Sequence, residues 1–280
     1  MSFRPHRALT CLQDDMHNEP GQDFPPLGMI GEELQLLDSE AGPLWFPMLD
    51  QVMREHVRHS GAWEPDIAKA IVQFMPREKG VFLDVGANVG YFSCLVARRF
   101  PSCVVHAFEP HPLTYQILRL NAWRYRRQIK PWPCALGDEL TTLSLEVAEN
   151  NLGDTRANAA EQAQSANMVA PAISLDELVP GLKADVVKID VQGAELSVLR
   201  GMMGVVRNSP AIKLITEFSP GMLGDSYVDP KAVLDALRDL GFKIHLLVSG
   251  DPVSAENAEI IGYCQSAGRH GQANLLLSVR

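Results

Sequence analysis

The 280-residue chain lacks the features that mark several classes of protein. Its apolar runs, such as Leu275, Leu276 and Leu277, are far shorter than the ~20 residues of a membrane-spanning helix, so no membrane partner is expected. The five cysteines are scattered and form no CxxC pair, which argues against a disulfide framework and against a zinc site. No apolar stretch follows the first basic residues, so we expect no signal peptide and a cytoplasmic location.

Basic residues are also in short supply. The chain has 25 Lys and Arg against 34 Asp and Glu, a formal net charge of -9. Such a chain is poorly suited to bind the phosphates of nucleic acids, so no nucleic-acid partner is expected. Residues 1–40 hold eight of the acids, only two bases and several prolines. We therefore predict an acidic, partly flexible N-terminal segment there.

The rest of the chain alternates short apolar runs with helical patterns. Helical spacing over residues 44–75 predicts a helical cap at 41–79. From residue 80 to 280 the alternation predicts an α/β fold with a mostly parallel, seven-stranded sheet and helices on both faces. Residues 242–248 and 274–279 are expected to end the sheet as an antiparallel pair. We predict a small added strand at 141–147, and loops at the polar stretches 149–171 and 249–273.

A glycine-rich turn, DVGANVG at residues 84–90, follows the first of these strands and opens a helix. Gly86 and Gly90 permit a tight turn and a close approach of a ligand. Asp84 stands just before them, where it would repel a dinucleotide pyrophosphate but attract a ligand that carries an ammonium and a sulfonium. Glu109 ends the second strand and could accept hydrogen bonds from a ribose diol. The pattern favours S-adenosylmethionine over NAD, and both carboxylates are expected to face the ligand and not the core.

With these motifs the chain resembles the FkbM family of S-adenosylmethionine-dependent methyltransferases, which have the class I, Rossmann-like fold. The resemblance runs from about residue 60 to 280. Its pieces are WEP at 63–65, LDVGANVGYF at 83–92, FEPHP at 108–112, Asn121, ALGD at 135–138, NLG at 151–153, KIDVQGAE at 188–195 and TE at 216–217.

The resemblance implies roles for individual residues. The methionine part of the cofactor would be held by Asp84, Gly86, Asn88 and Gly90, with Glu64 in a segment that folds back on its amino-acid end. Glu109 would bind the ribose. The adenine would lie between two sets of residues, Pro110 and His111 on one side and Ala135, Leu136 and Asp138 on the other.

Two acids are candidates for catalysis. A hydroxyl is a poor nucleophile at neutral pH, so a base or a metal would help it attack a methyl group. Asp190 and Glu217 end two strands that are expected to be neighbours. Either could be a base or a metal ligand; alternatively, Asp190 binds the cofactor and Glu217 braces a loop. The family usually has a glutamate where this chain has Gln192, which removes one charge. We expect Asp190 to act as a base or to position the acceptor, without a metal, and Lys188 to be a buried partner for an acid.

The sequence thus predicts a methyltransferase that uses S-adenosylmethionine, most simply for O-methylation of a small natural product such as a polyketide, glycoside or sugar. N- or C-methylation of a similar scaffold remains an alternative. A non-catalytic cofactor-binding protein is another, although the intact glycine loop and its two acids argue against it. Asp84 argues against an NAD-dependent dehydrogenase. The acceptor and a homodimeric state are left open.

Overall fold

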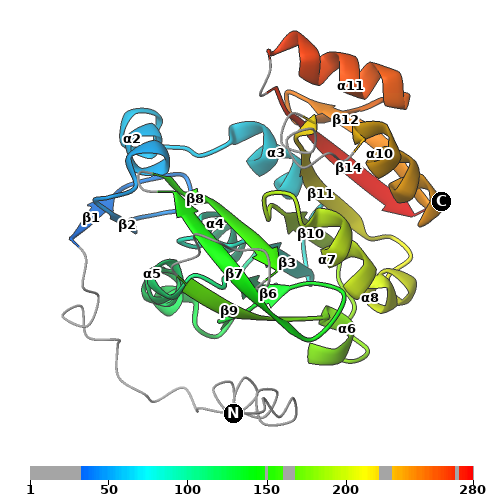
Figure 1. The fold of residues 1–280 in the computed structure, drawn as a ribbon. Helices are drawn as coiled ribbons and strands as arrows, with labels where there is room; N and C mark the ends of the chain where they lie inside the picture. Colours follow the sequence, from blue (N-terminus) through cyan, green and yellow to red (C-terminus); the bar gives the residue numbers. More distant parts are fainter. Residues whose placement is uncertain (1–32, 149–150, 160–167, 221–228, 269–270, 280) are drawn as a thin grey trace.

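The computed structural model describes residues 33–148, 151–159, 168–220, 229–268 and 271–279. Its described strands form a main sheet, a smaller four-stranded sheet and an N-terminal hairpin (Figure 1). The strands are β1 (Leu34–Leu37), β2 (Leu44–Pro47), β3 (Val81–Val85), β4 (Val104–Phe108), β5 (Ile129–Trp132), β6 (Ala135–Leu136), β7 (Thr141–Ala148), β8 (Asn151–Ala159), β9 (Met168–Ile173), β10 (Val186–Ile189), β11 (Lys213–Phe218), β12 (Phe242–Val248), β13 (Asp251–Ser254) and β14 (Ala273–Val279). The helices are α2 (Gln51–Ser60), α3 (Pro65–Phe74), α4 (Tyr91–Arg99), α5 (Pro112–Ala122), the 3-10 helix η2 (Trp123–Tyr125), α6 (Leu175–Leu178), α7 (Glu195–Gly201), α8 (Met203–Asn208), α10 (Pro230–Asp239) and α11 (Asn257–Ser266).

The main sheet has the order β13-β12-β14-β11-β10-β3-β4-β5. Its strands β11, β10, β3, β4 and β5 are parallel neighbours, whereas β14 runs antiparallel to both β11 and β12. The predicted mostly parallel sheet with a C-terminal antiparallel pair is therefore confirmed. The predicted count of seven is short by one, because β13 pairs with β12 and adds an edge strand.

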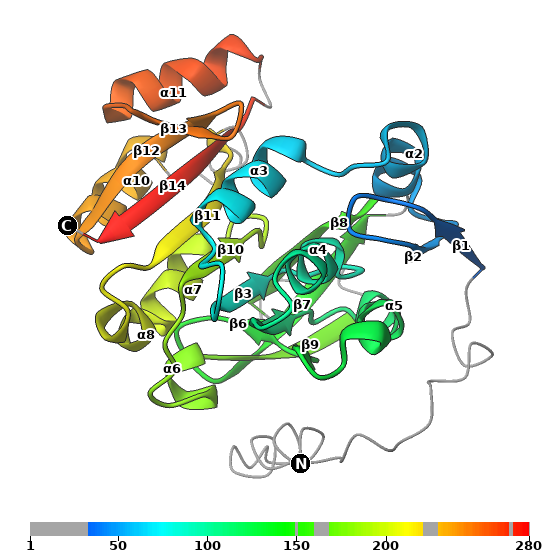
Figure 2. The same ribbon diagram turned by 180° about the vertical axis from the view of Figure 1, so that it is seen from behind.

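Both faces of the main sheet are buried by helices. Phe82 of β3 packs in a cluster with residues of α3, α4 and α5, whereas Leu83 and Val85 pack with residues of α7, α8 and α10. Figures 1 and 2 show these two groups of helices on opposite faces. Side chains of a strand alternate between faces, so a strand buried on both sides is apolar throughout. β10 follows this pattern except at Lys188, and all four of its residues are buried.

The N-terminal region differs in part from the prediction. The two helices expected within 41–79 are present as α2 and α3, but Leu44–Pro47 is a strand that pairs with β1 in an antiparallel hairpin. Leu44 and Phe46 are buried, and β2 lies against α5. Tertiary contact with α5 thus decides the conformation of a segment whose apolar spacing also suits a helix. Of the acidic segment predicted at 1–40, residues 1–32 lie outside the described residues.

Two predicted loops contain regular structure. β8 and the first residues of β9 fall within 149–171; together with β7, the added strand expected at 141–147, and β6 they form the smaller sheet. Residues 149–150 and 160–167 of that stretch lie outside the described residues. The second stretch, 249–273, contains β13 and α11, whose start is stabilised by a capping box between Glu256 and Glu259. Edge strands and partly exposed helices need few apolar residues, so their composition resembled that of loops. Within the described part of the chain, no helix is long and apolar enough to cross a membrane.

Candidate active site

The glycine loop lies between β3 and α4, at the carboxyl end of the central parallel strand. Gly86 and Gly90 have φ values of 76° and 86°, which glycine adopts without strain. The amides of Gly86 and Ala87 both donate to the carbonyl of Phe108, at 3.0 and 2.9 Å. A Cβ on Gly86 would lie 1.9 Å from the carbonyl oxygen of Asp190. The loop is therefore packed against the ends of both neighbouring strands, β4 and β10.

Asp84 is deeper than the sequence suggested. Its side chain is fully buried, so the expectation that it lies outside the core is wrong, whereas its contact with a ligand stays a prediction. Oδ2 accepts a hydrogen bond from the Ser93 hydroxyl at 2.6 Å, and Oδ1 lies 4.0 Å from Lys188 Nζ without a hydrogen-bond partner. Burial raises the pKa of the Asp84 carboxyl, and Lys188 and Ser93 oppose that shift.

Glu109 ties the glycine loop to the turn after β4. Oε2 accepts from the backbone amide of Asn88 at 2.7 Å, and Oε1 accepts from that of His111 at 2.8 Å. The residue is only 7% exposed, so the expectation that it lies outside the core is wrong here too, and its contact with a ribose stays a prediction. Burial raises the pKa of its carboxyl, against the effect of the two amides. Each carboxylate oxygen can accept more than one hydrogen bond, which leaves capacity for a diol.

The residues predicted around the adenine lie before α5 and in or just after β6. His111 precedes α5 and its Nδ1 accepts from the amide of Thr114 at 3.4 Å, so the imidazole caps that helix; burial lowers its pKa. Ala135 and Leu136 form β6, and Asp138 follows them. The Ser197 hydroxyl of α7 donates to Asp138 Oδ1 at 2.8 Å. Their adenine-binding roles, and that of Pro110, remain predictions.

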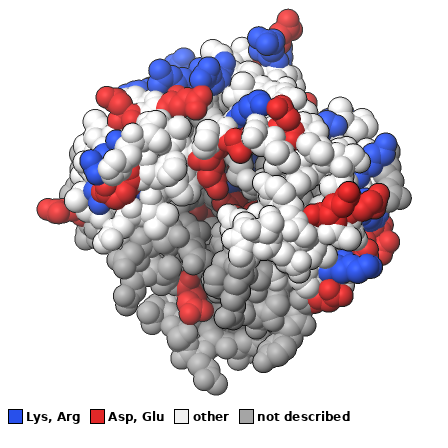
Figure 3. All heavy atoms as spheres, turned by 90° about the horizontal axis from the view of Figure 1, so that it is seen from above, with Lys and Arg blue, Asp and Glu red and all other residues white. Residues whose placement is uncertain are grey.

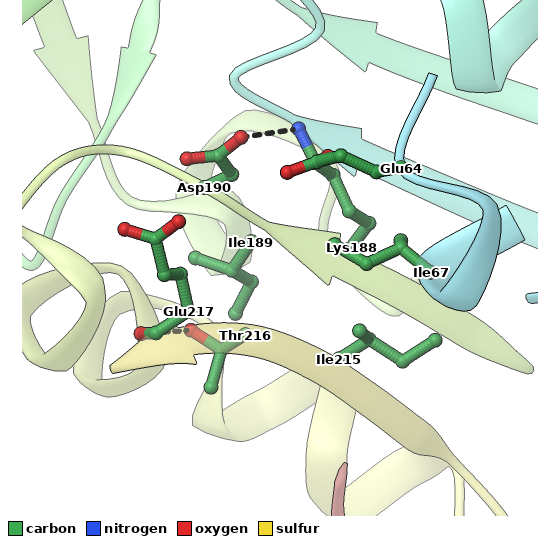
Figure 4. A pocket seen from close by; sticks show the side chains of 8 residues that line it. All are labelled: Glu64, Ile67, Lys188, Ile189, Asp190, Ile215, Thr216 and Glu217. Atoms are coloured by element: carbon green, nitrogen blue, oxygen red, sulfur yellow. Dashed lines mark hydrogen bonds and ion pairs between the residues drawn. The ribbon is translucent and has the colours of Figure 1, made fainter. Parts of the chain in front are cut away.

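A small pocket lies where β10 and β11 end beside the start of α3 (Figure 4). Three carboxyl groups and one ammonium line this pocket. On the face of the molecule seen in Figure 3, acidic side chains gather around a hollow. The sequence predicted Asp190 and Glu217 as neighbours at two strand ends, and the fold brings Glu64 to them. The residues that line the pocket are Glu64, Ile67, Lys188, Ile189, Asp190, Ile215, Thr216 and Glu217.

Two of these carboxyls share an unusual proton affinity. Burial, followed by repulsion from Asp190, raises the pKa of Glu64 and that of Glu217 to about 7 each. Glu64 Oε2 is buried without a hydrogen-bond partner, whereas Glu217 Oε1 accepts from the Ser219 hydroxyl at 2.8 Å. Glu64 also has a left-handed backbone, with a φ of 42°, at the residue before α3. Both groups can therefore exchange a proton near neutral pH.

Asp190 differs from its two neighbours because its oxygens are already engaged. Oδ2 lies 3.1 Å from Lys188 Nζ, and Oδ1 accepts from the side-chain amide of Gln192 at 3.0 Å. β10 ends at Ile189 and Gln192 has a left-handed backbone with a φ of 51°, so a turn, and not a continued strand, brings this amide to Asp190. The amide donates to the carboxylate, where a glutamate would repel it. The described residues contain no group of three or more His, Cys, Asp or Glu arranged to hold a metal ion.

Asn121 has a role that the sequence did not reveal. Its amide nitrogen donates to the carbonyls of Val89, at 2.8 Å, and Trp45, at 3.0 Å, and its oxygen accepts from the amide of Trp45 at 2.7 Å. A polar residue among apolar neighbours in α5 was the available signal. The side chain joins the N-terminal hairpin to the glycine loop.

The described residues fit S-adenosylmethionine in the chemistry of their donors and acceptors. Three buried side-chain oxygens at this end of the sheet have no hydrogen-bond partner, which is costly unless a ligand supplies one. A ligand with an ammonium and several hydroxyls could supply them. These oxygens are Glu64 Oε2, Asp84 Oδ1 and Asn88 Oδ1.

A glycine loop after the central strand, with acids at the neighbouring strand ends and the reversed strand β14 between β11 and β12, defines a class I methyltransferase. Comparison by sequence specifies the family: the Methyltransferase FkbM domain matches residues 84–244, and the chain belongs to this family.

Two curated relatives and one solved structure illustrate the range of similar proteins. The hexuronic acid methyltransferase AglP of Haloferax volcanii is 31% identical over 179 residues, which cover 63% of this chain and 68% of the relative. The 31-O-demethyl-FK506 methyltransferase FkbM of Streptomyces tacrolimicus is 43% identical over 63 residues, 22% of this chain and 24% of the relative. A TehB-like SAM-dependent methyltransferase from Corynebacterium glutamicum has a TM-score of 0.43 and 10% identity, covering 81% of this chain and 94% of that one.

Proposed function

We propose that this methyltransferase uses S-adenosylmethionine to methylate a hydroxyl group of a small molecule, such as a sugar, glycoside or polyketide. One observation carries the proposal: the glycine loop lies beside a pocket in which two carboxyls, Glu64 and Glu217, have a pKa of about 7. Such carboxyls can take up the proton that a hydroxyl releases. An unprotonated amine depends less on such a base than a hydroxyl does, because its nitrogen already has a nucleophilic lone pair.

The cofactor would be held mainly by the loop and by the buried acids around it. S-adenosylmethionine supplies a methyl group on a sulfonium, a good leaving group. Glu109 would accept from the ribose hydroxyls with its remaining lone pairs, and Glu64 would face the amino-acid end. Asp84, whose Oδ1 is buried without a hydrogen-bond partner among the described residues, would accept from the ammonium of the ligand. The residue-by-residue assignment of the adenine side follows the family resemblance: Pro110 and His111, with Ala135, Leu136 and Asp138 opposite.

Glu217 is the better placed of the two predicted catalytic acids to act as the base. Within the described part of the chain its carboxyl accepts a hydrogen bond from Ser219, and it changes charge near neutral pH. Asp190 is held by Lys188 and Gln192 on opposite oxygens, which suits a group that orients the acceptor. We therefore assign proton uptake to Glu217 and positioning to Asp190. No divalent metal is required in this scheme.

The names of two relatives support a small-molecule acceptor without identifying it. One refers to a hexuronic acid, and the other to 31-O-demethyl-FK506, in which the methylated atom is an oxygen. The acceptor of this chain is therefore proposed only as a small hydroxylated molecule. N- or C-methylation is the alternative that a product analysis would reveal.

The test has two stages. Calorimetric titration of the protein with S-adenosylhomocysteine, with NAD as the matched control, should show binding of the first ligand only. Candidate sugars, glycosides and polyketide alcohols are then incubated with methyl-labelled cofactor, before and after EDTA treatment, and the products are examined by mass spectrometry. Absence of S-adenosylhomocysteine binding, or labelling confined to nitrogen or carbon, would contradict the proposal; loss of turnover on chelation would contradict its metal-free part.

A further inference from the structure

Lys188 occupies a position at which the fold calls for an apolar side chain. It lies in the middle of β10, paired in register with Asp84 of β3 and Ile215 of β11, and it is only 4% exposed. The other residues of the strand are Val186, Val187 and Ile189. Burying an ammonium costs free energy unless several partners surround it. The contacts of Lys188 therefore indicate what the charge is for.

The Lys188 ammonium lies near four groups. Nζ donates to the carbonyl of Gly86 at 3.0 Å and lies 3.1 Å from Asp190 Oδ2, its two shortest interactions. Asp84 Oδ1 is more distant, at 4.0 Å, and the ring centre of Phe92, in the first turn of α4, is 5.3 Å away. The strongest interactions thus connect the first glycine of the loop to the acid at the end of β10. Neutralisation of Asp84 alone would not require them.

The ammonium is held in its charged form. Burial opposes the charge, but Asp190, Asp84 and Glu64 together outweigh burial, and the pKa of Lys188 is raised above its ordinary value. A protonated amine has no lone pair with which to attack or to accept a proton. Lys188 is consequently unsuited to be a nucleophile or a base.

We propose that Lys188 is a positioning residue, which joins the glycine loop to Asp190 and thereby holds the cofactor side and the acceptor side of the site in one relative placement. The inference rests on the proposed function for its consequence, cofactor binding, but its structural part concerns the loop alone. The competing explanation is that Lys188 only balances the buried charge of Asp84.

Two variants separate these explanations. Asp84→Asn removes the buried carboxylate, keeps an acceptor for Ser93 and leaves Lys188 in contact with Gly86 and Asp190. Lys188→Met in the same Asp84→Asn background removes the ammonium as well, so that no uncompensated charge remains at this pair. Hydrogen–deuterium exchange of the amides of residues 86–90 reads the loop directly. Urea unfolding of both variants corrects for any difference in global stability.

The proposal predicts at least tenfold faster exchange of the loop amides in the double variant than in Asp84→Asn, at matched global stability. It also predicts at least tenfold weaker binding of S-adenosylhomocysteine, with the pH dependence of that affinity moved to higher pH because the Glu64 carboxyl loses a neighbouring positive charge. Equal loop exchange, or faster exchange with unchanged affinity and pH dependence, would overturn it.

Failure of the proposed function would look different. If the wild-type protein does not bind S-adenosylhomocysteine, the function is refuted while loop exchange still decides the role of Lys188. If the double variant does not fold, Lys188→Gln in the same background replaces it. Its side chain is one bond shorter, so it is expected to release the loop as well, and retained protection would refute the proposal.

Discussion

Substitution of Gly86 by alanine tests whether the loop and the end of β10 are packed as the structure shows. Two penalties combine at this residue. Its φ of 76° costs an L-residue about 1–2 kcal/mol. The new Cβ would also lie 1.9 Å from the carbonyl oxygen of Asp190, whereas real Cβ contacts stay beyond 3.0 Å, so the backbone must move by about 1 Å. Forced overpacking of this kind typically costs about 1–3 kcal/mol.

The expected destabilisation is therefore about 2–5 kcal/mol, which is a large part of the ~5–15 kcal/mol stability of a typical domain. Gly61→Ala is the matched control. Gly61 ends α2 with a φ of 71°, but nothing lies within 4 Å of the added Cβ. It should cost only the backbone penalty, about 1–2 kcal/mol.

Urea unfolding measures both costs, and titration with S-adenosylhomocysteine measures the effect on the site. Gly86→Ala should weaken binding at least tenfold, because displacement of Asp190 also disturbs Lys188 and the loop, whereas Gly61→Ala should leave binding unchanged. If both variants lose the same stability and bind the ligand equally well, the close approach of loop and strand is refuted.

Four further outcomes are expected. Glu109→Gln should lower the free energy of unfolding by about 1–3 kcal/mol, because the new side-chain N–H faces one of the two backbone amides that the carboxylate accepts from. Calorimetry should also show at least tenfold weaker binding of S-adenosylhomocysteine, and unchanged affinity would contradict the assignment of Glu109 to the ribose. Asn121→Ala should lower the free energy of unfolding in urea by about 2–4 kcal/mol, since three hydrogen bonds break. A loss below about 0.5 kcal/mol, as for an ordinary surface substitution, would contradict the role of Asn121 in joining the hairpin to the loop. In the wild-type protein the rate of methyl transfer should rise with pH through about 7 as Glu217 ionises, and Glu217→Gln should lack that rise. The same pH profile in both proteins would refute Glu217 as the base. The folded pKa of Glu64, about 7, exceeds its ordinary 4.5, so the folded state binds more protons and its stability falls as pH rises between these values. Glu217 contributes a similar slope, so Glu64→Gln should remove about half of the fall and add up to about 3 kcal/mol at pH 8, as measured by urea unfolding at several pH values; an unchanged slope would contradict the raised pKa of Glu64.

Much of the fold was predictable because its signals are local. Parallel strands buried on both faces appear as short apolar runs, and the glycine loop appears as two glycines after such a run. Elements at the periphery were missed for the complementary reason. β13 is exposed and α11 is partly exposed, so few apolar residues mark them, and β2 became a strand through its contact with α5. Local composition could not report those contacts.

By itself, the sequence determined which chemical groups stand at the carboxyl ends of the strands. Strand order then follows from a few rules, and residues at strand ends share one edge of a sheet. The order of motifs was enough to predict the family and its cofactor. It also placed Asp190 and Glu217 together, since neighbouring strands end side by side.

Only the tertiary structure decided what each of those groups does. Asp84 and Glu109 turned out to be buried, because helices and the loop close over them, and their hydrogen bonds go to Ser93 and to backbone amides. Glu64 joined the pocket from a different part of the chain. Proton affinities depend on burial and on charges a few ångströms away, and such distances between remote residues exist only after the chain has folded.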